Sequence, residues 1–192
     1  MKMSAPALFA ALSLSVAPFA LAQQETFTVN PDASQVVFIL GGNGHHVQGT
    51  FHVQSGTVDL DPGGHKISGS IIVAAASGNS GEASRDKKMD TEVLDTAHFA
   101  EVAFAPASYQ GALAPSGDST IQVSGVFTLH GTPHDITVPM RVHIDGAAIT
   151  AKGSFTVPYV KWGLKDPSIF ILKVAKEVDI DLTLNGRLTR GE

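Results

Sequence analysis

Histidine is the residue type with the widest chemical use in this chain, which has eight histidines and no cysteines. Without cysteine there is no thiol nucleophile, no thiolate metal ligand and no disulfide. Imidazoles could still bind a metal, but a zinc site needs three or four converging ligands, and no HExxH or comparable spacing occurs. We therefore predict no metal site and keep a histidine metal centre as an alternative. The histidines are His45, His46, His52, His65, His98, His130, His134 and His143.

A Ser-His-Asp hydrolase is the enzymatic alternative, because all three residue types are present in the chain. Many such enzymes place the serine on a strand-to-helix turn within a Gly-x-Ser-x-Gly motif, and this motif does not occur here. We therefore predict that the chain is not an enzyme, that it has no catalytic residues and that it needs no cofactor.

A short charged segment contains the cations Arg85 and Lys88, and both residue types bind phosphate groups. These two residues are candidate contacts for the headgroup of a ligand, although such runs more often form the solvated face of a surface helix. Ser84 could cap this helix, and Met89 and Val93, four positions apart, would form one apolar stripe along it. The segment is predicted to be one short helix that lies over an end of a sheet.

The elements that would position these residues are mostly strands. Odd positions are apolar or Gly between residues 120 and 129, and even positions are apolar between residues 136 and 144, so each arm has one dry and one wet face. Gly131 and Pro133 are predicted to supply the turn of this antiparallel hairpin. The same period continues along most of the chain, and a phase shift near Gly56 indicates a β-bulge. Many strands with one helix imply an antiparallel barrel or sandwich.

The first 22 residues differ from the rest of the chain. An uncharged apolar run from Ala5 to Leu21 ends in a small-x-small cleavage pattern at Ala22. We predict a signal peptide over residues 1–22 and one exported, periplasmic domain over residues 23–192. No later stretch is apolar enough to span a bilayer, so stable membrane insertion is not expected. The net charge is −5 at pH 7, and without a Lys/Arg cluster of the kind that neutralises phosphates, nucleic-acid binding is not expected.

The inward positions of the predicted strands are wholly apolar, which suits either of two interiors. Periodicity alone favours a packed core, since most apolar stripes are core. An eight-stranded barrel is also wide enough for one slender ligand, and an apolar tunnel suits a branched hydrocarbon at roughly 0.8 kcal/mol per buried CH₂. Tyr159 and Trp162 could form a rim, a lid or a plug. The predicted inward residues are Phe38, Phe51, Phe104, Phe127, Leu129, Met140, Val142, Phe155 and Val157.

Several motifs follow one another along the predicted domain. They are Ser34-x-Val36-x-Phe38, Val47-x-Gly49-x-Phe51, Arg85-Asp86-x-x-Met89, His98-Phe99-x-x-Val102-x-Phe104, Val123-x-Gly125-x-Phe127-Thr128-Leu129-His130-Gly131 and Trp162-Gly163-Leu164-Lys165-x-Pro167-Ser168. In this order they resemble the YceI-like family over essentially the whole domain. Ala100 departs from the family's frequent Pro, and Tyr159-Val160-Lys161-Trp162-Gly163 departs from its usual Arg-x-x-Phe-Gly, so no role of that Arg is carried over.

The resemblance implies a lipocalin-like barrel of eight antiparallel strands whose interior holds a long polyisoprenoid chain. It also implies a link to isoprenoid quinones or their precursors, sometimes to stress responses, and a periplasmic location. The resemblance reverses the preference for a packed core, so the inward residues together with Tyr159 and Trp162 become the predicted lipid tunnel. Trp162 is expected to seal the mouth of the tunnel, and the loops Gly41–His46 and Lys161–Ser168 are the candidate gates.

The expected partner and ligand is therefore an isoprenoid lipid, and the expected function is binding, sequestration or transport without chemistry. A homodimer is compatible with the sequence. Two alternatives stay open. One is a periplasmic metal-binding protein that uses the histidines, and the other is a stress-protection or interaction module whose barrel is filled.

Overall fold

The computed structural model describes residues 24–61, 63–169 and 173–191, so the predicted signal peptide lies outside the described residues. Nine strands and three short helical segments follow one another along these residues. They are β1 (Glu25–Val29), the 3₁₀ turn η1 (Pro31–Ala33), β2 (Gln35–Gly42), β3 (His45–Asp61), β4 (Lys66–Asn79), α1 (Ala83–Lys88), the π-helix η2 (Met89–Leu94), β5 (Glu101–Gln110), β6 (Gly117–Leu129), β7 (Thr132–Asp145), β8 (Ala148–Val157) and β9 (Val178–Arg190).

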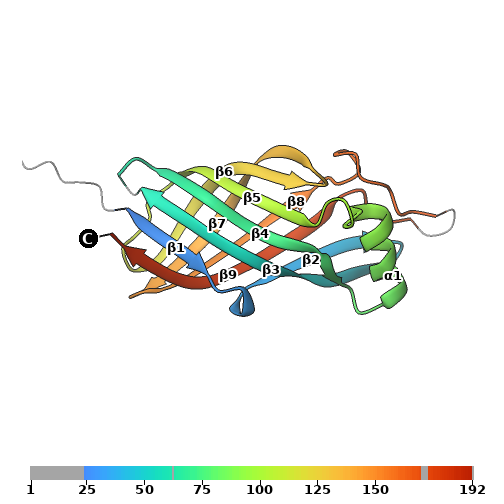
Figure 1. Ribbon diagram of the computed structural model, residues 1–192, viewed down its shortest axis with the longest axis horizontal. Helices are drawn as coiled ribbons and strands as arrows, with labels where there is room; N and C mark the ends of the chain where they lie inside the picture. Colours follow the sequence, from blue (N-terminus) through green and yellow to red (C-terminus); the bar gives the residue numbers. More distant parts are fainter. Residues whose placement is uncertain (1–23, 62, 170–172, 192) are drawn as a thin grey trace, which may run out of the picture.

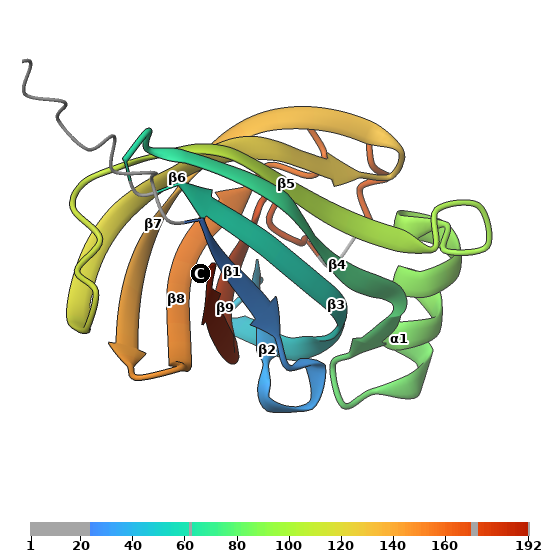
Figure 2. The same ribbon diagram turned by 60° about the vertical axis from the view of Figure 1, so that its left-hand side comes forward.

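The strands close into one antiparallel barrel (Figures 1 and 2). The sheet runs from β3 through β2, β9, β8, β7, β6 and β5 to β4, and pairing between β3 and β4 closes the ring. Strands β1 and β2 both lie between β3 and β9: β1 pairs with residues 57–60 of β3, and β2 pairs with residues 45–51. Because β1 and β2 share one position in the ring, the nine strands build the predicted eight-stranded barrel.

The interruption between β1 and β2 begins at Pro31, whose nitrogen carries no hydrogen for a ladder bond. Asn185 of β9 bridges the interruption with four hydrogen bonds, one of which its carbonyl accepts from Ser34 Oγ at 3.3 Å. Its backbone N–H donates to Ser34 Oγ at 3.0 Å, and its side-chain amide donates to the Ala33 carbonyl at 2.6 Å. Its carbonyl accepts from the Asn30 N–H at 2.8 Å. The two short strands therefore behave as one bent strand.

Strands β6 and β7 form the predicted hairpin, with residues 117–129 paired to residues 132–144. Its turn consists of His130 and Gly131, both with positive φ (51° and 70°), as a two-residue type I′ turn requires. The predicted role of Pro133 in the turn is wrong, because a proline ring fixes φ near −65°. Pro133 instead lies inside β7.

Strand β3 is irregular where the phase of its apolar residues changes. Its pairing with β4 shifts between Val53 and Ser55, which makes Gln54 the additional residue of a bulge close to the predicted position at Gly56. A second shift falls between Thr50 and His52. Bulges bend a strand and increase its twist, and both changes help a sheet to close into a barrel.

Helix α1 and the π-helix η2 form the predicted short helical segment, at the end of the barrel opposite the C-terminus (Figure 1). The expectation that Ser84 caps the helix is wrong, because Glu82 is the N-cap. The Glu82 carboxylate accepts hydrogen bonds from the backbone N–H groups of Ser84 and Arg85, at 3.1 and 2.9 Å. The hydrogen bonds from Ser84, first among them that of its hydroxyl, hold the pKa of Glu82 below its usual range.

Strands β7 and β8 separate toward the α1 end of the barrel. Strand β7 pairs with β6 along its whole length, whereas its pairing with β8 begins only at Met140 and Gly153. Pro133 and Pro139 lie in the part of β7 that has no partner on the β8 side, where a missing N–H costs no ladder bond. The barrel wall therefore contains a wedge-shaped gap in its hydrogen bonding at this end.

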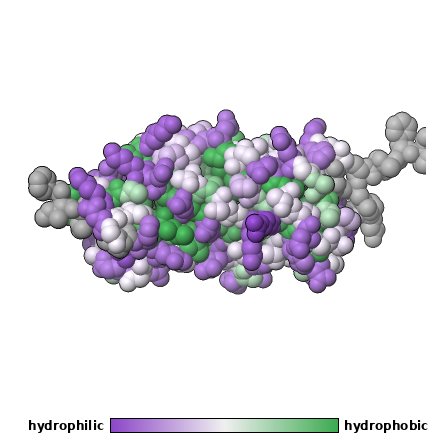
Figure 3. All heavy atoms as spheres, turned by 180° about the vertical axis from the view of Figure 1, so that it is seen from behind, coloured by the Kyte–Doolittle hydropathy of each residue, from purple (hydrophilic) through white to green (hydrophobic). Residues whose placement is uncertain are grey.

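The surface mixes polar and apolar side chains on the face shown in Figure 3. Among the described residues, Ile169 is the one large hydrophobic residue that is mostly exposed, at 53%. No polar or charged residue within the described ranges is buried. None of the described helices combines the length and the apolar character that crossing a membrane would require.

Candidate functional site

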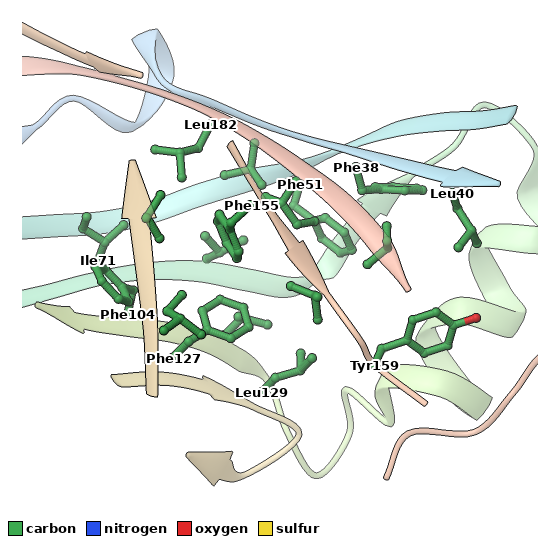
Figure 4. A pocket seen from close by; sticks show the side chains of 18 of the residues that line it. Phe38, Leu40, Phe51, Ile71, Phe104, Phe127, Leu129, Phe155, Tyr159 and Leu182 are labelled. Carbon is green, nitrogen blue, oxygen red and sulfur yellow. The ribbon is translucent and has the colours of Figure 1, made fainter. Parts of the chain in front are cut away.

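The barrel encloses an apolar cavity of about 520 Å³, within the size range typical of small-molecule sites. All nine strands contribute side chains to its lining, as do α1, η2 and the segment that follows β8. Side chains on a strand alternate between faces, so every second residue of these strands points toward the shared interior. Figure 4 shows aromatic and aliphatic side chains from opposite walls pointing into this space.

Ten of the eleven residues predicted for an apolar tunnel line this cavity, and so do the two candidate headgroup contacts, Arg85 and Lys88. That a lipid occupies the cavity remains a prediction. The ten lining residues are Phe38, Phe51, Phe104, Phe127, Leu129, Met140, Val142, Phe155, Val157 and Tyr159.

Trp162 is the exception, because it lies outside the lining of the cavity. Its indole stacks on the imidazole of His134, with ring centroids 3.8 Å apart and planes 6° apart, and its ring centroid is 6.0 Å from that of Phe127. His134 belongs to the part of β7 that has separated from β8, so Trp162 packs where the ladder has opened. The expectation that Trp162 lines the tunnel is therefore wrong, and its role in sealing the mouth stays a prediction. Because Phe127 and His134 are paired residues on the inward face of the β6–β7 hairpin, Trp162 packs against the inner side of this hairpin next to the cavity.

Several residues that line the cavity were not predicted, and the sequence contained a signal for only some of them. Val178, Ile180, Leu182 and Leu184 alternate strictly along β9 and all line the cavity, so their period of two was a sufficient signal. The π-helix also contributes lining residues, Met89 among them. No sequence period indicates these, since a π-helix is a rare local departure from the α-helical repeat.

Phenylalanines occupy the middle of the cavity. Phe38 and Phe51 lie on the paired strands β2 and β3, with ring centroids 5.4 Å apart. Phe127 and Phe155 approach each other edge to face at 5.6 Å from β6 and β8. Rings in tilted and edge-to-face arrangements pack favourably while leaving irregular space between them. The central section of the cavity is therefore a channel lined by phenylalanine rings, which an unsaturated hydrocarbon chain could occupy.

Polar residues line the cavity at its α1 end. This end is formed by the helical segment, the β2–β3 turn and the segment between β8 and β9. Two lysines connect the helical segment to the segment after β8. The Lys88 ammonium donates to the Pro167 carbonyl at 3.1 Å, and the Lys165 ammonium pairs with the Glu92 carboxylate at 2.6 Å. We define this end as the mouth of the cavity. Its polar and cationic lining residues are Asn43, Ser80, Ser84, Arg85, Lys88 and Lys173.

Tyr159 connects the lining of the mouth to the segment that precedes β9. Its hydroxyl donates to the Ala175 carbonyl at 2.6 Å while its ring faces the cavity. The Ala175 N–H in turn donates to the Gly41 carbonyl at 2.8 Å, which ties this segment to the end of β2. Burial, helped by the nearby Asp166 carboxylate, raises the pKa of Tyr159 to about 12. The phenol is therefore neutral at physiological pH.

The described histidine side chains are not grouped with other metal-ligating residues. Within the described parts of the chain, no three His, Asp or Glu side chains are grouped so that they could hold a metal ion. His98 pairs with Asp95 at 2.9 Å and His143 pairs with Asp118 at 2.8 Å, both at exposed positions. His134 is engaged with Trp162, as described above. The geometry of the described residues therefore does not favour the histidine metal centre.

Comparison with known proteins agrees with this architecture. A family model for the YceI-like domain matches residues 27–186. The chain belongs to the YceI-like family. This match spans the barrel from β1 to β9, so the motifs that suggested the family in the sequence lie within one fold.

Several solved structures share this fold. BcnA from Burkholderia cenocepacia is 23% identical, with a TM-score of 0.66, over 82% of this chain and 99% of that one. A polyisoprenoid binding domain from Saccharophagus degradans implicated in plant cell wall breakdown is 16% identical, with a TM-score of 0.64, over 85% and 98%. A Campylobacter jejuni YceI protein is 11% identical, with a TM-score of 0.56, over 92% and 91%. None of the curated proteins compared with the chain matches it.

Proposed function

We propose that this YceI-like barrel binds a polyisoprenoid lipid, an isoprenoid quinone or one of its precursors, and sequesters or carries it in the periplasm without altering it. The observation that carries the proposal is the apolar cavity enclosed by the barrel, with its polar lining residues gathered at one end. The binding of a polyisoprenoid by the structurally similar Saccharophagus degradans domain supports the same ligand class.

The cavity suits a long branched hydrocarbon for energetic reasons. Each CH₂ transferred from water to the apolar interior contributes roughly 0.8 kcal/mol, and an isoprenoid presents many such groups along one thread. Nothing in the middle of the cavity requires a polar partner, because the lining there is formed by rings and aliphatic side chains such as Phe104, Phe155 and Leu182. Affinity is therefore expected to rise with chain length until the chain fills the barrel.

The composition of the interior also supports a binding role without chemistry. General acids, bases and nucleophiles need titratable or activated side chains that reach the reacting atoms. Apart from the cations of the mouth, the one titratable group among the described lining residues is the Tyr159 phenol, and its pKa of about 12 keeps it neutral. The cations of the lining are confined to the mouth. The periplasmic location rests on the signal pattern at residues 1–22.

Organic extraction tests the proposal directly. The full chain is expressed in a bacterium that exports it, purified without detergent and extracted with solvent, and the extract is analysed by mass spectrometry. The expected result is an isoprenoid lipid at close to one molecule per barrel. An extract without isoprenoid, together with no uptake of added geranylgeraniol by native mass spectrometry, contradicts the proposal. The absence of geranylgeraniol uptake is also the result expected if the barrel is filled by its own side chains.

A further inference from the structure

The charged residues that line the cavity are all cationic within the described parts of the chain. Arg85 and Lys88 come from α1, and Lys173 comes from the segment before β9. No described Asp or Glu lines the cavity. The passage of a neutral hydrocarbon chain does not require lining charges of one sign only. The excess of positive charge at the mouth therefore indicates a ligand that carries negative charge.

The carboxylates near the mouth are engaged elsewhere. Asp86 accepts the Ser80 N–H at 2.8 Å, and Asp166 accepts the Ser168 N–H at 2.9 Å. Glu92 pairs directly with Lys165, and that contact, ahead of the more distant charge of Lys88, holds the pKa of Glu92 below its usual range. Among the described ion pairs, none includes Arg85, Lys88 or Lys173. No described carboxylate forms a direct ion pair with them, although, after the hydrogen bonds from nearby serines, Arg85 and Lys173 each help to lower the pKa of a carboxyl near the mouth, Glu82 and Asp166 respectively.

Two of these cations are held in place and keep donors to spare. The Arg85 guanidinium donates through Nε to Ser80 Oγ at 2.7 Å and through Nη2 to the Ser80 carbonyl at 3.1 Å. The Lys88 ammonium has three donors, and one of them is directed to the Pro167 carbonyl. Because neutral oxygens of the protein fix both groups, their positions are set while their charge stays available to a ligand.

We propose that the mouth selects an anionic headgroup, a phosphate or diphosphate esterified to the end of the isoprenoid chain. This inference rests on the proposed function and specifies the headgroup that accompanies the lipid. The apolar chain lies along the channel lined by phenylalanine rings, and the phosphate oxygens accept hydrogen bonds from Lys88, Arg85 and Lys173. Charge-assisted hydrogen bonds are about twice as strong as neutral ones, and water is partly excluded at the rim of the apolar cavity.

A matched pair of ligands and a matched pair of variants test this headgroup assignment. Geranylgeranyl diphosphate and geranylgeraniol have the same hydrocarbon chain and differ in the anion. The Lys88→Gln variant removes the charge and retains a donor for the Pro167 carbonyl, and Lys87→Gln removes a neighbouring charge that does not line the cavity. Dissociation constants are measured by native mass spectrometry, with thermal unfolding as the check on folding. Inorganic diphosphate alone is the third ligand.

The wild-type chain is expected to bind the diphosphate more tightly than the alcohol. Lys88→Gln should reduce that preference about tenfold, the effect of losing one charge-assisted hydrogen bond, and Lys87→Gln should leave it unchanged. The preference should also weaken as salt is added. Equal binding of both lipids by the wild type overturns the headgroup assignment and leaves the proposed function intact. Binding of neither lipid overturns the proposed function. Inorganic diphosphate that binds as tightly as the lipid diphosphate would indicate a free-anion site, which also overturns the assignment.

Discussion

The two ends of the barrel are built differently from the same strands. At the end where Gln24 and Gly191 lie, residues such as Tyr109, Ile144 and Leu188 are buried without lining the cavity, so side chains fill this end. At the α1 end, β7 and β8 separate, a π-helix replaces a regular helix, and the cavity lining becomes polar. The β7–β8 ladder is complete at the packed end and open at the mouth, whereas the β4–β5 ladder is irregular between Lys66 and Ile71 at the packed end. This difference divides the residues that stabilise the fold from those expected to serve the ligand.

The largest expected effect comes from placing a charge inside the cavity. Phe127→Asp should abolish lipid retention and destabilise the fold by several kcal/mol, because an unpaired carboxylate would replace a ring in an apolar interior. The neighbouring Thr128→Asp should do neither, because Thr128 does not line the cavity. Solvent-extracted lipid and thermal unfolding are measured for both variants. Equal, mild effects of the two substitutions would mean that the alternation along β6 does not separate interior from exterior.

The next prediction compares the same substitution, isoleucine to alanine, at the packed end and in the cavity. Ile144 is 2% exposed and lies in the packed end, whereas Ile71 lines the cavity. Ile144→Ala should lower the free energy of unfolding by about 2–5 kcal/mol and leave lipid affinity unchanged. Ile71→Ala should cost less stability, because its side chain already borders empty space, and should change lipid affinity. Denaturant unfolding and ligand titration are measured for both. A larger stability loss at Ile71 would remove the distinction between the two regions.

A smaller effect is expected at the rim of the mouth. Tyr159→Phe removes the hydrogen bond to the Ala175 carbonyl and should cost about 1 kcal/mol, with the ring contacts retained. The pKa of Tyr159 is raised in the folded state from 10.0 to about 12, so folding favours the neutral phenol. Its contribution to stability should be complete below pH 10 and should be lost as the pH rises toward 12. Unfolding free energies of wild type and variant that stay equally far apart across this range would contradict the assignment.

The smallest expected effect is spectroscopic. Trp162 is the single tryptophan, and it contacts the lining residue Phe127 without itself lining the cavity. Its emission maximum should therefore shift little when lipid is added, even at saturation. A large blue shift in the presence of geranylgeraniol would show that the ligand reaches the Trp162–His134 stack. In that case the gap between β7 and β8 would belong to the binding site.

The part of the molecule that could be predicted from sequence is the part made of regular strands. Period-two alternation predicted the β6–β7 hairpin and ten cavity-lining residues, because each strand residue faces in or out according to its parity. The mouth could not be predicted in this way. Lys88 meets Pro167, and Gly42 pairs with Val174, across long separations in the chain that no local pattern encodes.

Local chemistry was also decisive where the predictions failed. The helix begins with a glutamate cap, because an extended backbone at Glu82 lets the carboxylate reach the first N–H groups. Trp162 was expected to seal a mouth because of its size and its position in a loop. The separation of β7 from β8, with Pro133 and Pro139 in the separated part, creates the niche that it occupies. Both prolines are visible in the sequence, but the sequence does not show that the β7 segment containing them is unpaired on its β8 side.

The ends of the folded chain adjoin each other far from the mouth. The Gly191 N–H donates to the Gln24 carbonyl at 2.9 Å, at the end of the barrel opposite α1 (Figure 1). A short linker between these residues would give a circular permutant, and the β7–β8 turn at residues 146–147, on the same side of the barrel, offers a new opening. A fluorescent protein or a sensor surface attached there would leave the α1 end facing the solution. The barrel could therefore be mounted as a lipid probe without blocking the opening through which it would load.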